Sequence, residues 1–312
     1  MGDKHTERLQ ADDAGIARAA ELLAAGGLVA LPTETVYGLA ARADSTEAVA
    51  AIYRAKQRPD FNPLIVHVPD LAAAEALAEF DPRARMLAAR FWPGPLTLVL
   101  PLRAEAAVTA AVTAGLPTIA LRCPAHPIMQ AVLQRSGVPV AAPSANRSGA
   151  VSPTTADHVR ATLDRRIDAV LDGGPCGRGL ESTIVAVRAV GWQLLRAGPV
   201  TERELIALLG APLEVTTARV EAPGQLAQHY SPGKPVRLNA TAADPGEFLI
   251  GFGTVTGDCS LSATGDPAEA AARLYACLHL AAASGEPRVA VAPVPESGIG
   301  AAINDRLRRA AA

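Results

Sequence analysis

Along the first two-thirds of the chain, stretches with apolar residues at helical spacing alternate with short runs of apolar residues. Apolar residues at helical spacing predict helices, and short apolar runs predict strands. The predicted helices are 13–25, 46–57 (with Thr46 as N-cap), 71–91, 155–165 and 201–209, and the predicted strands are 28–33, 64–68, 96–100, 118–122, 138–144, 169–174, 182–187 and 192–198. Several strands follow one another closely, so the pattern indicates an α/β domain with a mixed, twisted sheet.

The pattern changes in residues 211–235. This segment contains four prolines and two glycines and has weak periodicity, which is typical of a linker. A second α/β pattern follows, with strands at 247–253 and 288–294 and helices at 267–283 and 299–310. We therefore expect a catalytic domain at 1–210, a linker or lid at 211–235 and a smaller Rossmann-like C-terminal domain at 236–312.

Composition narrows the class of protein. The 312 residues are 49% hydrophobic and 19% charged, which allows a sizeable core and argues against disorder. The formal net charge of -2 argues against RNA binding as the main activity. The four cysteines form no C-x-x-C pair, so we expect reduced thiols and no metal centre. The polar N-terminus and the lack of a long apolar stretch predict a cytoplasmic protein.

Polar and cationic groups collect where the predicted strands end. PTETVYG (32–38) follows one strand, and KQRPDFNP (56–63) puts Lys56 and Arg58 at the end of a helix. Ligand sites in open α/β sheets gather at strand ends, although the helix dipole also explains cations at a helix C-terminus. A cationic turn between two core elements is well placed to hold phosphates.

Two further side chains have two readings each. His67 lies inside an apolar strand, where a core histidine and a catalyst are about equally expected. Arg122 closes a buried strand and requires an anionic partner, which a substrate or a protein carboxylate would supply. The loops 143–149 and 177–183 could hold an anion. No G-x-x-x-x-G-K-[ST] sequence occurs, so a P-loop is not expected.

Taken together, these segments resemble the threonylcarbamoyl-AMP synthase family, also called YrdC-like proteins. The matching segments are PTETVYGL, KQRP with NPLIVHV, WPGPLTLVL, TIALRCPAHP, PSANRSG with SPT, and DGGPCGRGLESTIV. They occur in family order over roughly residues 15 to 210. PGQLAQHYSP and the α/β pattern after it resemble the longer, two-domain branch of the family. The resemblance implies a YrdC-like fold with an open cavity.

The resemblance also implies a set of ligand residues. Lys56 and Arg58 match the K-x-R signature and are the expected catalytic residues. The positions that match ATP contacts are Arg58, Asn62, Thr118, Ser144, Asn146, Ser152, Arg196 and Tyr230, and those that match threonine contacts are Thr35, His67, Arg122, Ala142 and Ser182. Gln57 departs from the family, which frequently has glycine at that position.

The activity implied is a nucleotidyl transfer that converts L-threonine, bicarbonate and ATP, with Mg²⁺, into threonylcarbamoyl-AMP and pyrophosphate. This product would pass to the tRNA threonylcarbamoyl-transferase machinery, and tRNA itself would be at most a transient partner. The alternatives are an RNA-binding module, a regulatory nucleotide-binding protein, and a carbamoyl transferase of hydrogenase maturation. The last normally carries C-x-x-C pairs, which this chain lacks.

Overall fold

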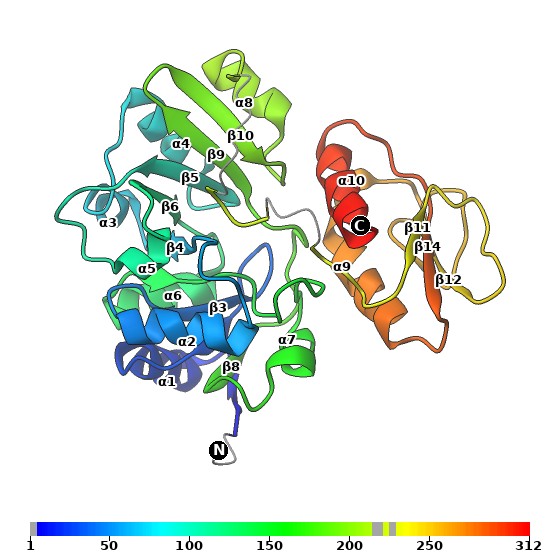
Figure 1. Ribbon diagram of the computed structural model, residues 1–312, viewed down its shortest axis with the longest axis horizontal. Helices are drawn as coiled ribbons and strands as arrows, with labels where there is room; N and C mark the ends of the chain where they lie inside the picture. The colour runs from blue at the N-terminus through cyan, green and yellow to red at the C-terminus, as the bar shows by residue number, and fades with distance from the viewer. Residues whose placement is uncertain (1–4, 214–220, 225–228) are drawn as a thin grey trace.

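The computed structural model describes residues 5–213, 221–224 and 229–312. Figure 1 shows two lobes, and helices α9 and α10 of the smaller lobe lie on the side that faces the larger lobe. The larger lobe contains β1 (Glu7–Gln10), α1 (Asp13–Ala24), β2 (Val29–Leu31), β3 (Gly38–Arg42), α2 (Thr46–Lys56), β4 (Ile65–His67), α3 (Leu71–Glu75), α4 (Pro82–Phe91), β5 (Leu96–Pro101), α5 (Ala110–Thr113), β6 (Thr118–Arg122), α6 (Pro127–Ser136), β7 (Val140–Ala141), α7 (Ala156–Leu163), β8 (Ala169–Asp172), β9 (Thr183–Arg188), β10 (Gly191–Arg196) and α8 (Glu202–Leu209).

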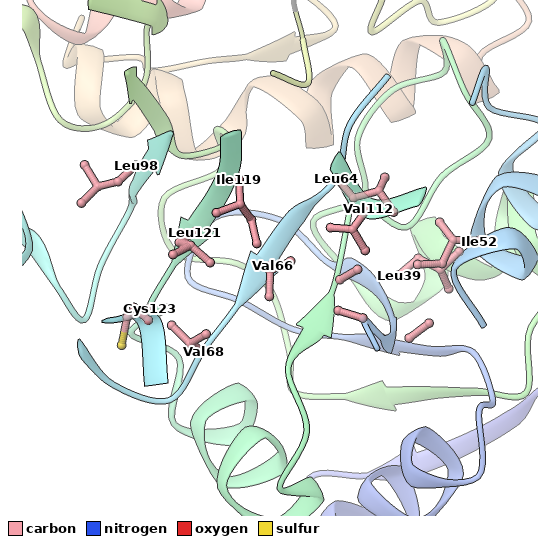
Figure 2. Close-up of a cluster of buried hydrophobic side chains, with 14 of the residues drawn as sticks. Leu39, Ile52, Leu64, Val66, Val68, Leu98, Val112, Ile119, Leu121 and Cys123 are labelled. Carbon is pink, nitrogen blue, oxygen red and sulfur yellow. The ribbon is translucent and has the colours of Figure 1, made fainter. Parts of the chain in front are cut away.

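The larger lobe is built on one mixed sheet, as the sequence predicted. Its ten strands run in the order β1-β8-β2-β3-β7-β4-β6-β5-β9-β10, and both parallel and antiparallel pairs occur. Helices α1 and α6 pack on one face through Leu23 and Met129, whereas α2 and α4 cover the other through Ile52 and Leu87. Figure 2 shows part of the core on this second face, including Ile52 from α2 and Val66 from β4.

Residue alternation along β4 and β6 creates the face that matters for function. Val66 and Leu121 point into the helix-covered core, so their neighbours point to the opposite face. In the parallel pairing of these strands, His67 lies directly opposite Arg122. Two polar side chains therefore stand side by side on a buried sheet.

The smaller lobe contains a four-stranded sheet in the order β11-β14-β12-β13, and each pair of neighbouring strands is parallel. Its elements are β11 (Val236–Leu238), β12 (Glu247–Gly251), β13 (Cys259–Ser260), α9 (Pro267–Ala283), β14 (Arg288–Val291) and α10 (Ile299–Ala310). Leu274 of α9 and Ile303 of α10 share a buried cluster with Leu180 and Val151 of the larger lobe. One apolar core therefore joins the two lobes.

Several predicted elements differ in their boundaries. Residues 71–91 form two helices rather than one, because Asp81 caps a new helix that has Pro82 at its first position. The N-cap of α2 is Ser45 and not Thr46, since the Ser45 hydroxyl accepts a hydrogen bond from the backbone amide of Ala48. The strand predicted at 138–144 is reduced to Val140–Ala141. The sequence pattern did not predict β1, β3 or α6.

The thiols agree with the expectation of reduced cysteines. All four cysteines are free, and only Cys259 is partly exposed. Within the described ranges, no helix combines the length and apolarity needed to cross a lipid bilayer.

Candidate functional site

A cavity opens on the sheet face that carries His67 and Arg122. Strands β4, β6 and β10 supply part of its wall, and residues that precede and follow the undescribed segment 225–228 supply another part. Its lining consists of Val36, Arg58, Ile65, His67, Arg122, Ala142, Pro143, Ser144, Glu181, Ser182, Arg196, Pro223, Gly224, His229 and Tyr230. Three arginines facing one small cavity make it suited to anions.

The end of α2 directs Lys56 and Arg58 differently. Gln57 caps the helix in the left-handed conformation, with φ 53°, which glycine adopts with the least strain. Arg58 is 8% exposed, lines the cavity and donates to the carbonyl of Pro63 at 3.1 Å. Burial lowers the pKa of its guanidinium to about 10, so the group stays charged at neutral pH.

Lys56 lies behind the cavity wall. Its ammonium donates to the carbonyls of Ser144 and Asn146, and burial lowers the pKa of this group well below its ordinary value. The lysine therefore ties α2 to the loop that presents Ser144. The sequence placed Lys56 among the phosphate contacts, whereas its position here favours a role in holding this loop.

The loop after β7 is held from a second side by Tyr37 and the first residues of β3. The amide of Ala145 donates to the carbonyl of Tyr37 at 2.8 Å, and the amide of Leu39 donates to that of Pro143 at 2.7 Å. A Cβ at Gly38 would lie 3.2 Å from the Ala142 side chain, which is tight enough to push the two segments apart. Ser144 thus stands on a doubly supported backbone.

Arg122 is oriented by a carboxylate of the protein. One of its Nη atoms donates to Glu34 at 2.7 Å, and its Nε donates to the carbonyl of Gly94 at 3.3 Å. Burial alone would raise the pKa of Glu34, but Arg122 lowers it below its ordinary value. The protein thus supplies one anionic partner for Arg122, and the guanidinium still lines the cavity, where it could meet a substrate carboxylate.

His67 is buried and neutral. Burial, followed by the charge of Arg122, lowers its pKa to about 3. Its Nδ1 atom has no hydrogen-bond partner among the described residues. A buried polar atom without a partner carries an energetic cost, so a ligand in the cavity is a natural partner for it. A general-base role toward an ammonium group is disfavoured by so low a pKa.

Ser182 and Arg196 form the opposite wall. The Arg196 guanidinium donates to the Ser182 carbonyl at 2.9 Å and to its hydroxyl at 3.1 Å, and Thr97 shares a hydrogen bond with the same hydroxyl at 2.7 Å. Glu181 accepts from the hydroxyl of Ser152 at 2.6 Å. The Ser182 hydroxyl is therefore held in one rotamer by Arg196 and Thr97, which suits a group that orients a ligand.

The structure gathers eight of the predicted site residues around the cavity. These are Arg58, His67, Arg122, Ala142, Ser144, Ser182, Arg196 and Tyr230. Asn146 and Ser152 are buried; Asn146 donates to the carbonyl of Ala150, and Ser152 donates to Glu181, which lines the cavity. Thr35 is fully buried, with its hydroxyl 2.8 Å from that of Thr33, and it does not line the cavity.

Asn62 and Thr118 lie at the starting ends of β4 and β6. The register that pairs Ile65 with Ala120 also brings Thr118 beside the residues that enter β4. This end of the strands carries Arg58, whereas the far end carries His67 and Arg122. Two predicted nucleotide contacts, Asn62 and Thr118, therefore lie at the opposite end of these strands from two predicted threonine contacts, His67 and Arg122.

The sequence assigned no role to Glu34, which holds Arg122 in place, or to Glu181, which lines the cavity and pairs with Arg306. Their motifs were recognised, but both glutamates stand in polar segments, PTETVYG and GRGLEST, so no local signal marked them as members of buried ion pairs. Val36 and Gly224 also line the cavity without having been predicted. Within the described residues, no group of three or more histidine, cysteine or acidic side chains is arranged to hold a metal.

The fold and the site define an α/β protein with a buried, arginine-lined cavity for small anionic ligands. A family model described as telomere recombination, for Sua5, YciO and YrdC proteins, matches residues 21–198. A second model, the threonylcarbamoyl-AMP synthase C-terminal domain, matches residues 200–312. The chain therefore belongs to the threonylcarbamoyl-AMP synthase family, in its two-domain form.

Individual relatives agree with this assignment. Threonylcarbamoyl-AMP synthase of Bacillus subtilis is 44% identical over 252 residues, which span 78% of this chain and 72% of the relative. Threonylcarbamoyl-AMP synthase of Pyrococcus abyssi is 38% identical over 317 residues, which span 94% of this chain and 92% of the relative. The crystal structure of P. abyssi Sua5 complexed with L-threonine matches with a TM-score of 0.89 and 35% identity, over 98% of this chain and 97% of that one.

Proposed function

We propose that this chain is a nucleotidyltransferase that converts L-threonine, bicarbonate and ATP into threonylcarbamoyl-AMP and pyrophosphate. The observation that carries the proposal is the convergence of Arg58, Arg122 and Arg196 on one cavity with Ser144 and Ser182. Relatives that match most of the chain bear the name of this activity, and the similar P. abyssi structure is a complex with L-threonine.

The amino acid is assigned to the end of the cavity formed by His67 and Arg122. The Arg122 guanidinium would bind its carboxylate, and Ser182 and the Ala142 backbone would bind its other polar groups. The unpartnered Nδ1 of His67 would exchange a hydrogen bond with the amine or with the carbamate made from it. Thr35 would act indirectly, by supporting the segment that carries Glu34 through its hydrogen bond with Thr33.

The nucleotide is assigned to the other end, where Arg58 lies beside the segment that enters β4. Arg58 would offset phosphate charge, and Ser144 would donate a hydrogen bond to a phosphate oxygen. Lys56 would keep the Ser144 loop in place. The remaining nucleotide assignments rest on the family motifs and on their position around this end: Asn62, Thr118, Asn146, Ser152, Arg196 and Tyr230.

The chemistry needs no covalent enzyme intermediate. The threonine amine adds to the carbon of bicarbonate-derived CO2 and loses a proton, which gives a carbamate. A carbamate oxygen then forms a bond to the α-phosphorus of ATP while the bond to the bridging oxygen breaks, and pyrophosphate leaves. The contribution of this chain is to align the two reactants and to stabilise negative charge.

Mg²⁺ is proposed only as a companion of the triphosphate. The two carboxylates closest to the site are already paired, Glu34 with Arg122 and Glu181 with Arg306. These residues do not form a protein-built magnesium site, which agrees with the preference of Mg²⁺ for substrate phosphates and water. Bound in that way, the ion would neutralise phosphate charge.

Product formation is the decisive experiment. The full chain is incubated with ATP, L-threonine and labelled bicarbonate, and labelled threonylcarbamoyl-AMP and pyrophosphate are measured. The proposal requires both products, in equal amounts and only when all three substrates are present. Tight ATP binding without either product would instead indicate a regulatory nucleotide-binding protein.

Two further assignments accompany this function. We propose that the product is handed to a tRNA threonylcarbamoyl-transferase system in the cytoplasm, with tRNA itself at most transiently bound. We also propose the division into a catalytic part at 1–210, a connecting part at 211–235 and a C-terminal domain at 236–312. A titration with tRNA at increasing salt tests direct binding, because phosphate contacts produce a steep salt dependence.

A further inference from the structure

The interface between the lobes contains a buried ion pair directly behind the cavity. Arg306 of α10 has no exposed surface, and its Nε lies 3.1 Å from Glu181, whose side chain is 8% exposed. Tyr275 of α9 donates its hydroxyl to the same Glu181 oxygen at 2.7 Å. Two residues of the C-terminal lobe therefore hold a carboxylate that lines the cavity of the other lobe.

The same guanidinium has two further contacts with cavity segments. An Nη atom of Arg306 donates to the carbonyl of Ala197 at 2.9 Å, and Ala197 directly follows Arg196. The Arg306 guanidinium also lies 5.3 Å from the centroid of the Tyr230 ring, which itself lines the cavity. Because Glu181 directly precedes Ser182, this one side chain reaches three segments, each of which carries or adjoins a cavity group.

We propose that Arg306 is a positioning residue for the cavity, which holds Ser182, Arg196 and Tyr230 in their ligand-binding arrangement through Glu181, Ala197 and the Tyr230 ring. This assigns a role to the C-terminal lobe in binding L-threonine and the nucleotide. The inference rests on the proposed function, since it concerns the ligands of that same site.

The geometry explains why an arginine side chain suits this position. A planar guanidinium offers donors in several fixed directions, so it satisfies Glu181, Ala197 and Asp305 together. A lysine ammonium is a single point of charge on a flexible chain and cannot reach all three. Arg306→Lys should therefore keep the charge but lose part of the alignment.

The test compares ligand binding by full-length variants. Arg306→Met should raise the dissociation constant for L-threonine about tenfold, which is a modest loss of binding free energy, and Arg306→Lys should fall between it and the unaltered protein. Arg308→Met is the matched control, because Arg308 lies on the same helix and pairs with Glu296 at the surface. The control should bind L-threonine as the unaltered protein does.

A merely structural role for Arg306 makes a different prediction. It would lower the melting temperature and the folded fraction but leave the dissociation constant of the folded protein unchanged. That result, obtained by calorimetric titration with the folded fraction measured by circular dichroism, would overturn the proposal. If Arg306→Met does not fold, Arg306→Lys keeps the charge but loses part of the alignment, and an unchanged threonine affinity in this variant would equally overturn the proposal.

Coupling to the cavity is tested by a double-mutant cycle. If Arg306 acts through Ser182, Arg306→Lys should weaken threonine binding much less in the Ser182→Ala background than in the unaltered protein. Full additivity would contradict this route. If the unaltered protein forms no product, the proposed function is refuted. If it forms product normally and Arg306→Met leaves the dissociation constant for L-threonine unchanged, only the positioning role is refuted.

Discussion

Arg122 and Glu34 form a buried ion pair, in which the guanidinium donates to the carboxylate at 2.7 Å and the two side chains are 5% and 15% exposed. The pair joins the end of β6 to the segment that follows β2. The sequence left two partners open for Arg122, a substrate carboxylate or a protein carboxylate. Because the protein carboxylate holds the guanidinium in place at the cavity wall, it pre-orients Arg122 for a second anion.

Removal of Arg122 should therefore affect both binding and stability. We expect Arg122→Ala to raise the KM for L-threonine by about 30-fold or more, since truncating one partner of a buried charge pair costs about 2 kcal/mol at least. The melting temperature should also fall, because Glu34 is left buried and unpaired. Arg42→Ala is the control, as Arg42 pairs with Asp44 at a more exposed site. A normal KM in Arg122→Ala would contradict the carboxylate assignment.

Arg58→Ala should impair use of ATP. The side chain supplies buried positive charge to the proposed nucleotide end, so we expect kcat/KM for ATP to fall by about 10²-fold. The exposed Arg54 on the same helix provides the control variant Arg54→Ala. Threonine-dependent pyrophosphate release measures both. Equal rates of pyrophosphate release in the two variants would contradict the assignment of Arg58 to the phosphate site.

Lys56→Ala should lower activity by a different route. Loss of the ammonium frees the carbonyls of Ser144 and Asn146, so the loop loses its tie to α2. We expect a loss of kcat/KM of about 10²-fold, the size caused by displacing a positioned binding group by about 1 Å, together with a lower melting temperature. Full activity in a destabilised Lys56→Ala variant would contradict the need for a fixed loop.

His67 should remain neutral throughout the range in which the enzyme works. Its pKa is lowered to about 3, first by burial and then by Arg122, so its protonation contributes nothing to the activity profile around neutral pH. We expect His67→Asn to change the KM for L-threonine but not the shape of that profile. NMR titration, with the His67 signal identified by its absence in His67→Asn, measures the pKa directly. An imidazole that titrates near neutral pH would contradict the prediction.

Glu181 should make the unfolding free energy depend on pH in acid. Burial alone would raise its pKa, but Arg306 and then Arg196 lower it from 4.5 to about 2. The folded state favours the carboxylate, so the stabilisation is complete above pH 4.5 and is lost as pH falls toward 2. Glu181→Gln should lack this loss, which is about 3 kcal/mol. The exposed Glu286→Gln is the control, and equal slopes in both variants would refute the prediction.

Much of the secondary structure could be predicted because local signals were strong. The sequence placed α9 at 267–283 and α10 at 299–310, with the same bounds as in the structure. Asp266 and Pro267 mark the start of α9 with an N-cap and a first-turn proline. In contrast, β3 was missed, because GLAAR has small residues and no alternation, and one of its two pairing partners, β7, is distant in sequence.

The sequence by itself determined the alternation of elements, the cationic and hydroxyl residues at strand ends, and the motifs shared with one family. Only the tertiary structure decided which of these side chains face one cavity, that Lys56 supports the loop behind it, and that Arg306 pairs with Glu181 from another lobe. The physical reason is the separation along the sequence over which each interaction acts. Helix caps and periodicity act within a few residues, whereas burial and charge pairing depend on contacts that strand register and lobe packing create.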